Sequence, residues 1–169
     1  LYSRASPTQG PFLDLLENAP AEGLRLIRSV VEHATDWQRE QYRKERQPFP
    51  TVNIPFPEGK QSFEGDWSVY YWARSIMPST ITASALMALE AWAHQQIEAG
   101  RPFAEVLHDV LGPDGSSIAF LAVAVDLVLS HFPLAYDVAW PMVATPEVLT
   151  FDNARHTRDM TGVDRMSTF

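Results

Sequence analysis

The sequence contains no cysteine, which excludes disulfide bonds, thiol catalysis and cysteine-ligated zinc or iron–sulfur sites. It also lacks a long uninterrupted apolar run. The longest stretch, residues 118–129, contains Asp126 and falls short of the roughly 20 residues that a bilayer requires. The opening residues, LYSRASPTQGPF, have no apolar core of the kind found in signal peptides. We therefore predict a cytoplasmic protein without a membrane span, in which residues 118–129 form a buried core helix.

Basic residues are scarce as well. Thirteen Lys and Arg stand against 21 Asp and Glu, which gives a formal net charge of −8. An acidic surface repels phosphate backbones, so a nucleic-acid partner is not expected. No GxxxxGK[ST], GxGxxG, GxSxG, HExxH or EF-hand pattern occurs, so we predict no cofactor. What the chain does have is the composition of a folded domain, with 46% hydrophobic and 20% charged residues.

Apolar residues recur at three- and four-residue steps in two long segments, which predicts two amphipathic helices that bury one face. The first runs from Pro20 to about Glu45, and its predicted buried positions are Leu24, Ile27, Val30, Val31, Ala34 and Trp37. The second runs from Ser79 to Ala99, with Ile81, Ala85, Leu86, Leu89, Trp92, Ala93 and Ile97 on the buried face. Proline, glycine and short polar residues delimit further, shorter helices.

These patterns predict a mainly all-α fold of stacked αα-hairpins, in a HEAT-like or irregular helical solenoid. A compact helical bundle is the alternative. We expect a single helical domain over residues 1–169, and a segment of a larger protein, since the chain begins with Leu1 rather than Met. Its predicted parts are a first helical hairpin at 11–46, a Pro-rich insertion at 47–66, a helical array at 67–159 and a frayed tail at 160–169.

The insertion, QPFPTVNIPFPEGKQSFEGD, contains four prolines that interrupt the helical pattern. We predict a loop or a short β-hairpin here, with no central strand containing proline. Because loops carry binding residues more often than cores do, this segment is a candidate for partner contacts. The residues predicted to make such contacts are Phe49, Ile54, Phe56, Lys60 and Trp67. The alternative is a structural insertion that covers helix ends.

Two sets of polar residues have spacings that place them on one helix face. Asp152, His156 and Asp159 form the first set, a candidate metal or acid–base site. Glu90, His94 and Glu98 form a second candidate set of metal ligands. The alternative for both is a solvated surface or a salt-bridge surface.

Asp126 lies alone in an apolar helix, and a buried carboxylate requires a partner. An arginine, a serine hydroxyl or a helix N-terminus would satisfy it. We interpret Asp126 as a structural polar tie; the alternative is a functional group with a raised pKa.

Four stretches, PAEGLRLIRSVVEHAT, GDWSVYYWAR, SALMALEAW and SSIAFLAVAVDLVLSHFP, resemble a helical region of very large bacterial ATP-binding proteins of the STAND (NACHT-like) class. The resemblance covers roughly residues 11–160. In that class, some members of which serve in anti-phage defence, a P-loop module performs the nucleotide chemistry. Helical repeats sense a ligand or hold the assembly closed. Since this chain has no P-loop, the resemblance implies the non-catalytic part, and no catalytic residue is carried over.

These observations predict a non-enzymatic scaffold or sensor segment whose partners are other domains of a larger chain or another protein. Two alternatives remain. One is an enzyme or metal-binding helical domain that uses Asp152, His156 and Asp159. The other is a nucleotide-regulated assembly in which this segment only relays a conformational change.

Overall fold

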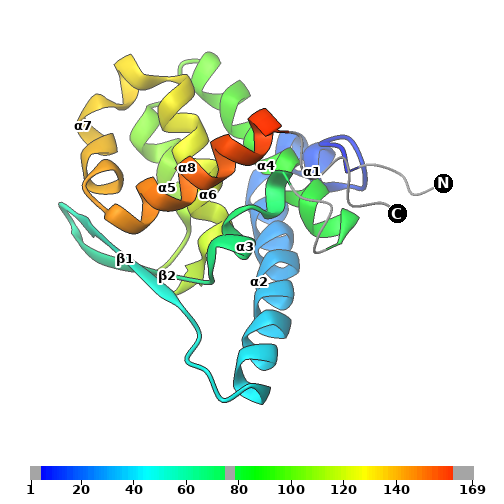
Figure 1. Ribbon diagram of the computed structural model, residues 1–169. Coiled ribbons are helices and arrows are strands. Elements are labelled where there is room, and N and C mark those ends of the chain that lie inside the picture. The colour runs from blue at the N-terminus through cyan, green and yellow to red at the C-terminus, as the bar shows by residue number, and fades with distance from the viewer. Residues whose placement is uncertain (1–4, 75–78, 162–169) are drawn as a thin grey trace.

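The computed structural model describes residues 5–74 and 79–161, and it confirms the predicted mainly helical class (Figure 1). A small three-stranded sheet accompanies the helices. The helices are α1 (Phe12–Asn18), α2 (Pro20–Lys44), α3 (Trp67–Tyr70), the 3-10 helix η1 (Trp72–Arg74), α4 (Thr80–Glu98), α5 (Phe103–Leu111), α6 (Ile118–Ser130), α7 (Phe132–Val143) and α8 (Pro146–Thr161). The strands are β1 (Thr51–Phe56), β2 (Gly59–Glu64) and β3 (Ser116–Ser117).

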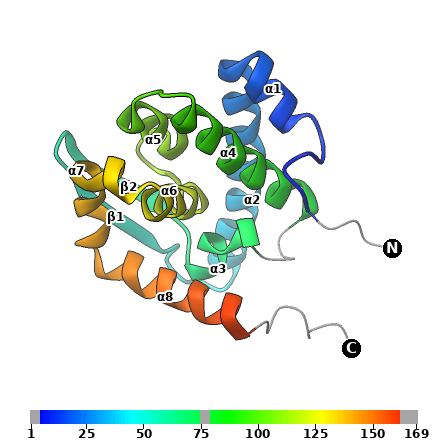
Figure 2. The same ribbon diagram turned by 90° about the horizontal axis from the view of Figure 1, so that it is seen from above.

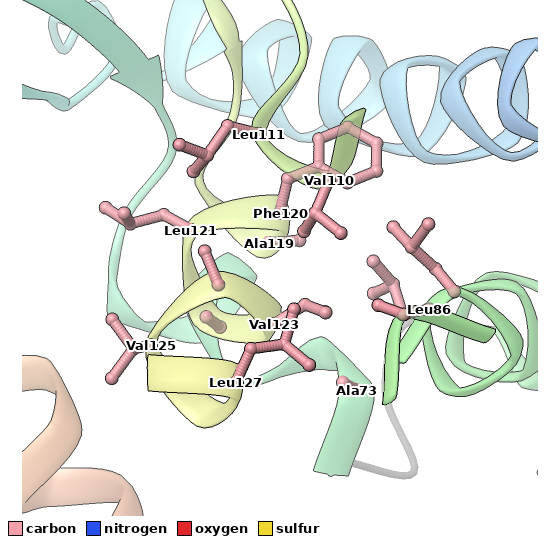
Figure 3. Packing of buried hydrophobic residues seen from close by; sticks show 14 of the residues in the cluster. Ala73, Leu86, Val110, Leu111, Ala119, Phe120, Leu121, Val123, Val125 and Leu127 are labelled. Atoms are coloured by element: carbon pink, nitrogen blue, oxygen red, sulfur yellow. The ribbon is translucent and has the colours of Figure 1, made fainter. Parts of the chain in front are cut away.

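Helix α6 forms the centre of the packing. It contacts α3, α4, α5, α7 and η1, and the view from above shows these helices arranged around it (Figure 2). Phe120, Leu121 and Leu127 are among its buried side chains, and Figure 3 shows Phe120 beside Val110 of α5 and Leu121 on the side of α6 away from Leu86 of α4. A helix that is apolar on nearly every side requires neighbours on nearly every side. The prediction of a buried core helix at 118–129 thus agrees with the structure.

Helices α1 and α2 form a hairpin whose close approach depends on a glycine. A Cβ atom at Gly23 would lie 2.7 Å from the backbone nitrogen of Leu16, closer than side-chain atoms pack. Any larger residue at position 23 would therefore push the two helices apart.

The Pro-rich insertion contains the β1–β2 hairpin. The strands pair antiparallel, with Phe56 opposite Gly59 and the Pro57-Glu58 turn between them. Pro55 lies on β1, the edge strand, where its missing N–H costs no ladder hydrogen bond. Strand β2 lies between β1 and β3 and pairs with β3 in parallel. Thr35 of α2 donates a hydrogen bond to Ser117 Oγ of β3 at 2.8 Å, which fixes the sheet to the long helix.

Two residues predicted to be buried are exposed. Trp37 is 61% exposed, because the C-terminal end of α2 extends beyond the other helices (Figure 1). Ile81, in the first turn of α4, is exposed to the same degree. Helical periodicity identifies which residues share a face, but it does not show how far the neighbouring helices extend along that face. Of the predicted frayed tail, residues 160 and 161 belong to α8, and the rest lies outside the described residues.

Asp66 connects the end of α2 to the start of α3. Its carboxylate accepts hydrogen bonds from the backbone N–H groups of Ser68 (2.9 Å) and Val69 (3.1 Å) and from the Tyr42 hydroxyl (2.5 Å). Burial alone would raise the pKa of Asp66, but these bonds and that of the Ser68 hydroxyl outweigh it and lower the pKa. The same contact raises the pKa of Tyr42 to about 12.

We expect Asp66→Asn to destabilise the protein at neutral pH by about 1 kcal/mol, because a neutral cap accepts weaker hydrogen bonds. A carboxyl group whose pKa is lowered by folding stabilises the fold above its unfolded pKa, about 4, and loses that contribution as the pH falls through the folded pKa. The difference between wild type and variant should therefore shrink below about pH 4. Urea unfolding at several pH values measures it, and a difference that stays constant down to pH 2 would contradict this role.

Candidate functional site

A cluster of charged side chains joins η1, α4, α6 and α8 near one end of the core. Arg74 Nη2 contacts Glu90 Oε1 at 2.7 Å and Asp126 Oδ2 at 3.0 Å. On the other side, Arg155 Nη1 contacts Asp126 Oδ1 at 2.9 Å, and its Nη2 contacts Asp152 at 2.8 Å. We call these five residues the carboxylate–arginine cluster. Asp126 is thus satisfied by arginines, one of the partners that its isolation in the sequence predicts.

The pKa values of the two central carboxyl groups are shifted in opposite directions. Desolvation raises the pKa of Glu90 to about 7, and the nearby negative charge of Asp126 adds to the effect. Burial also acts to raise the pKa of Asp126, but hydrogen bonds from Arg155 and Glu90 reverse it and lower the pKa. Of the two carboxyl groups, Glu90 therefore holds a proton more readily than Asp126.

A histidine pair lies beside this cluster. His94, one turn after Glu90 on α4, places its Nδ1 atom 2.9 Å from Nε2 of His131. Burial and the neighbouring His131 lower the pKa of His94, which favours the neutral ring. A ring nitrogen of His94, a carboxylate oxygen of Glu90 and a carboxylate oxygen of Asp126 all lie within 4.8 Å of one another. Glu90, His94 and Asp126 could therefore hold one metal ion.

Tyr70 completes this region from α3. Its side chain is 1% exposed, and burial together with the neighbouring Asp152 carboxylate raises the pKa of its hydroxyl. Tyr70 lines a small cavity of about 10 Å³ together with Arg74, Glu90, Asp126 and Arg155. That volume is close to what a single water molecule occupies and is too small for an organic substrate.

The first set of predicted metal ligands is not assembled by the described residues. Asp152 is bound by Arg155, and His156 is exposed. The side chain of Asp159 lies outside the described part of the chain. In the second set, Glu90 and His94 do come together, but the third residue beside them is Asp126 of α6, and Glu98 is exposed. The solvated-surface alternative for this set is wrong for Glu90, because its side chain is only 14% exposed and pairs with Arg74.

The residues predicted to contact a partner from the insertion occupy different environments. Ile54 is fully buried in the core, so it is not accessible to a partner. Phe49 packs edge-on against Tyr42, and Trp67 stacks under the guanidinium of Arg158 at 4.3 Å. Phe56 and Lys60 line a hollow of about 390 Å³ between the hairpin turn and helices α5 and α7.

A surface that was not predicted lies on α7. Phe132, Tyr136, Trp140 and Val143 follow one another at four-, four- and three-residue steps, so they share one face of the helix. All four are between 44% and 73% exposed, and the Phe132 and Tyr136 rings contact edge to face with centroids 6.1 Å apart. We call these four residues the α7 aromatic face. The opposite side of α7 carries Ala135, Ala139 and Met142, which are buried in the core.

The spacing of the α7 aromatic face was visible in the sequence, but apolar spacing alone equally describes a buried helix. Comparison with known proteins does not decide between these readings. No family model, curated protein or solved structure matches the chain. The resemblance to the STAND class therefore stays a prediction.

Within residues 5–74 and 79–161, no helix has both the length and the apolarity that crossing a bilayer demands.

Proposed function

We propose that this chain is a non-enzymatic helical interaction segment whose main contact surface is the α7 aromatic face. The observation that carries the proposal is the exposure of Tyr136 (69%) and Trp140 (73%) beside Phe132 and Val143 on one helix face. Isolated exposed apolar residues are common, but a contiguous exposed patch marks a binding surface. Tyr and Trp are also the residues that most often dominate interface energies.

The negative charge of the chain favours a partner that carries basic residues. Helix α7, FPLAYDVAWPMV, contains Asp137 and no basic residue, and the whole chain carries a formal charge of −8. A second copy of this chain would bring the same negative charge to the interface, whereas a basic partner would be attracted. The partner that fits best is therefore an amphipathic polypeptide segment with apolar anchors and flanking Lys or Arg residues. It belongs either to another domain of a longer chain or to a separate protein.

This function extends the prediction made from the sequence. In a larger protein, helical units stacked in a HEAT-like array would place the α7 aromatic face against a neighbouring unit or a ligand-sensing partner. Membership of a STAND-type assembly, with its possible role in anti-phage defence, is compatible with such a contact and remains part of the proposal. The alternative enzyme or metal role of Asp152, His156 and Asp159 has less support, since Asp152 is paired with Arg155 and His156 is exposed.

Binding of synthetic peptides tests this function. A fluorescent amphipathic Leu/Lys helix should bind the protein, and a Leu/Glu helix of the same pattern should not. In the double variant Tyr136→Ala/Trp140→Ala the Kd for the Leu/Lys helix should rise about tenfold or more, since truncating central aromatic residues costs on the order of 2 kcal/mol. Fluorescence anisotropy measures both values.

Trp37→Ala is the matched control, because Trp37 has similar exposure but lies on α2, away from any comparable patch. It should leave the Kd unchanged. Equal binding of both peptides, or equal loss in the control, would contradict the proposal. Self-association abolished by the double variant would instead identify a second copy as the occupant, and binding only to lipid vesicles would identify a membrane surface.

A further inference from the structure

We propose that Glu90, His94 and Asp126 form a binding site for a divalent transition-metal ion of the zinc class, which takes the position held here by the guanidinium of Arg74. This inference concerns a different part of the molecule from the α7 aromatic face and does not depend on the proposed function. Two carboxylates and one imidazole are ligands that Zn²⁺ accepts, and three protein ligands leave a fourth position for water.

The ligand atoms are already close together. Glu90 and His94 lie one turn apart on α4, and Asp126 faces them from α6, with all three ligand atoms within 4.8 Å of one another. Around a tetrahedral zinc ion with bonds of about 2.0–2.2 Å, ligand atoms lie about 3.3 Å apart. The ligand atoms therefore have to approach one another by at most about 1.5 Å to reach that geometry.

Arg74 marks the place where a cation is stabilised. A single nitrogen, Nη2, bridges Glu90 Oε1 at 2.7 Å and Asp126 Oδ2 at 3.0 Å. Arg74 lies at the end of η1 and is a third exposed, so its long side chain can leave without disturbing the core. Its departure would free both oxygens for the metal ion, and the charge of the ion would replace the charge of the guanidinium.

Two neighbours provide the outer shell that metal sites require. Arg155 contacts the other oxygen of Asp126, Oδ1, and so holds the carboxylate in place without occupying the ligand oxygen. When His94 donates from Nδ1 to His131 Nε2, the tautomer leaves a lone pair on Nε2 of His94. That nitrogen is then available to a metal ion.

The cavity beside the site supplies an independent observation. The side chain of Tyr70, whose hydroxyl is close to the Asp152 carboxylate, lines the same small cavity as Glu90 and Asp126. A cavity of about 10 Å³ has room for one water molecule, the fourth ligand that the site requires.

Titration of the full chain with Co²⁺ and Zn²⁺ tests the site. We expect one Co²⁺ per chain, with the visible d–d absorption of a four-coordinate nitrogen–oxygen site, displaced by Zn²⁺. Arg74→Ala should bind at least tenfold more tightly, because the competing cation is gone. His94→Ala should lose the absorption band. Far-ultraviolet circular dichroism establishes that each variant is folded.

His156→Ala is the control, since His156 is an exposed histidine outside the site, and it should bind like the wild type. The absence of binding in both the wild type and Arg74→Ala would overturn the proposal. So would unchanged binding in His94→Ala, or a loss in His156→Ala as large as that in His94→Ala. None of these outcomes bears on peptide binding at the α7 aromatic face.

Discussion

Replacing Arg155 by alanine should lower the free energy of unfolding by about 3 kcal/mol, at the lower end of what breaking a buried ion pair costs. Arg155 is only 12% exposed and is bound to both Asp126 and Asp152. Without it, the side of Asp126 that faces α8 has a charge that no guanidinium compensates. The cost is high because the carboxylate stays buried while its partner is removed.

The loss should be concentrated in α8. Among the described side chains of this helix, Val148 is buried and Phe151 is partly buried against the core, and Arg155 adds the ion pair that joins it to Asp126 of α6. Chemical denaturation measures the total effect, and amide hydrogen exchange should show faster exchange in α8 than in α4. Arg25→Ala is the control, because Arg25 is 80% exposed and pairs with Glu22 on the same helix. It should cost less than about 1 kcal/mol. Equal effects of the two changes would contradict the structural role of Arg155.

Leu121→Ala should destabilise the protein by about 3–4 kcal/mol, the usual cost of a cavity in a tightly packed core. Leu121 is fully buried on α6, the helix around which the others are arranged, as Figures 2 and 3 show. Few neighbours can move to fill the space, because α6 is contacted from most directions. Thermal and urea unfolding would both report the loss.

Leu129→Ala is a control of the same chemistry on the same helix. Leu129 is 56% exposed near the C-terminal end of α6, so its truncation should cost less than about 1 kcal/mol. If the two alanine variants were equally stable, α6 would not be the centre of the core.

Much of the helical fold could be predicted from the sequence because the signals are local. The three- and four-residue spacing in residues 20–45 and 79–99 predicted α2 and α4, and Ser79 does cap α4 by accepting a hydrogen bond from Thr82 N–H at 3.1 Å. Trp37 and Ile81 were placed wrongly because their exposure depends on where neighbouring helices end, which no local pattern records.

The carboxylate–arginine cluster could be predicted only in part, because its residues are far apart in the sequence. The isolation of Asp126 predicted that it has a partner, but the partners, Arg74 and Arg155, are separated from it by 52 and 29 residues. The four-residue spacing of Glu90 and His94 was visible in the sequence. That Asp126, and not Glu98, lies beside them depends on the packing of α4 against α6, which the sequence does not show. The α7 aromatic face could not be recognised because the sequence does not show which side of α7 meets the core.

The central claim, that the α7 aromatic face docks another polypeptide, is tested most directly by site-specific photo-cross-linking in cells that make the full-length protein. A photoreactive residue at position 140 should form adducts with a polypeptide segment that carries apolar residues and flanking Lys or Arg. The same residue at position 37, a tryptophan site on α2 that is 61% exposed against 73% for Trp140, should form few. Adducts of equal yield at both positions, or none at position 140, would contradict the claim.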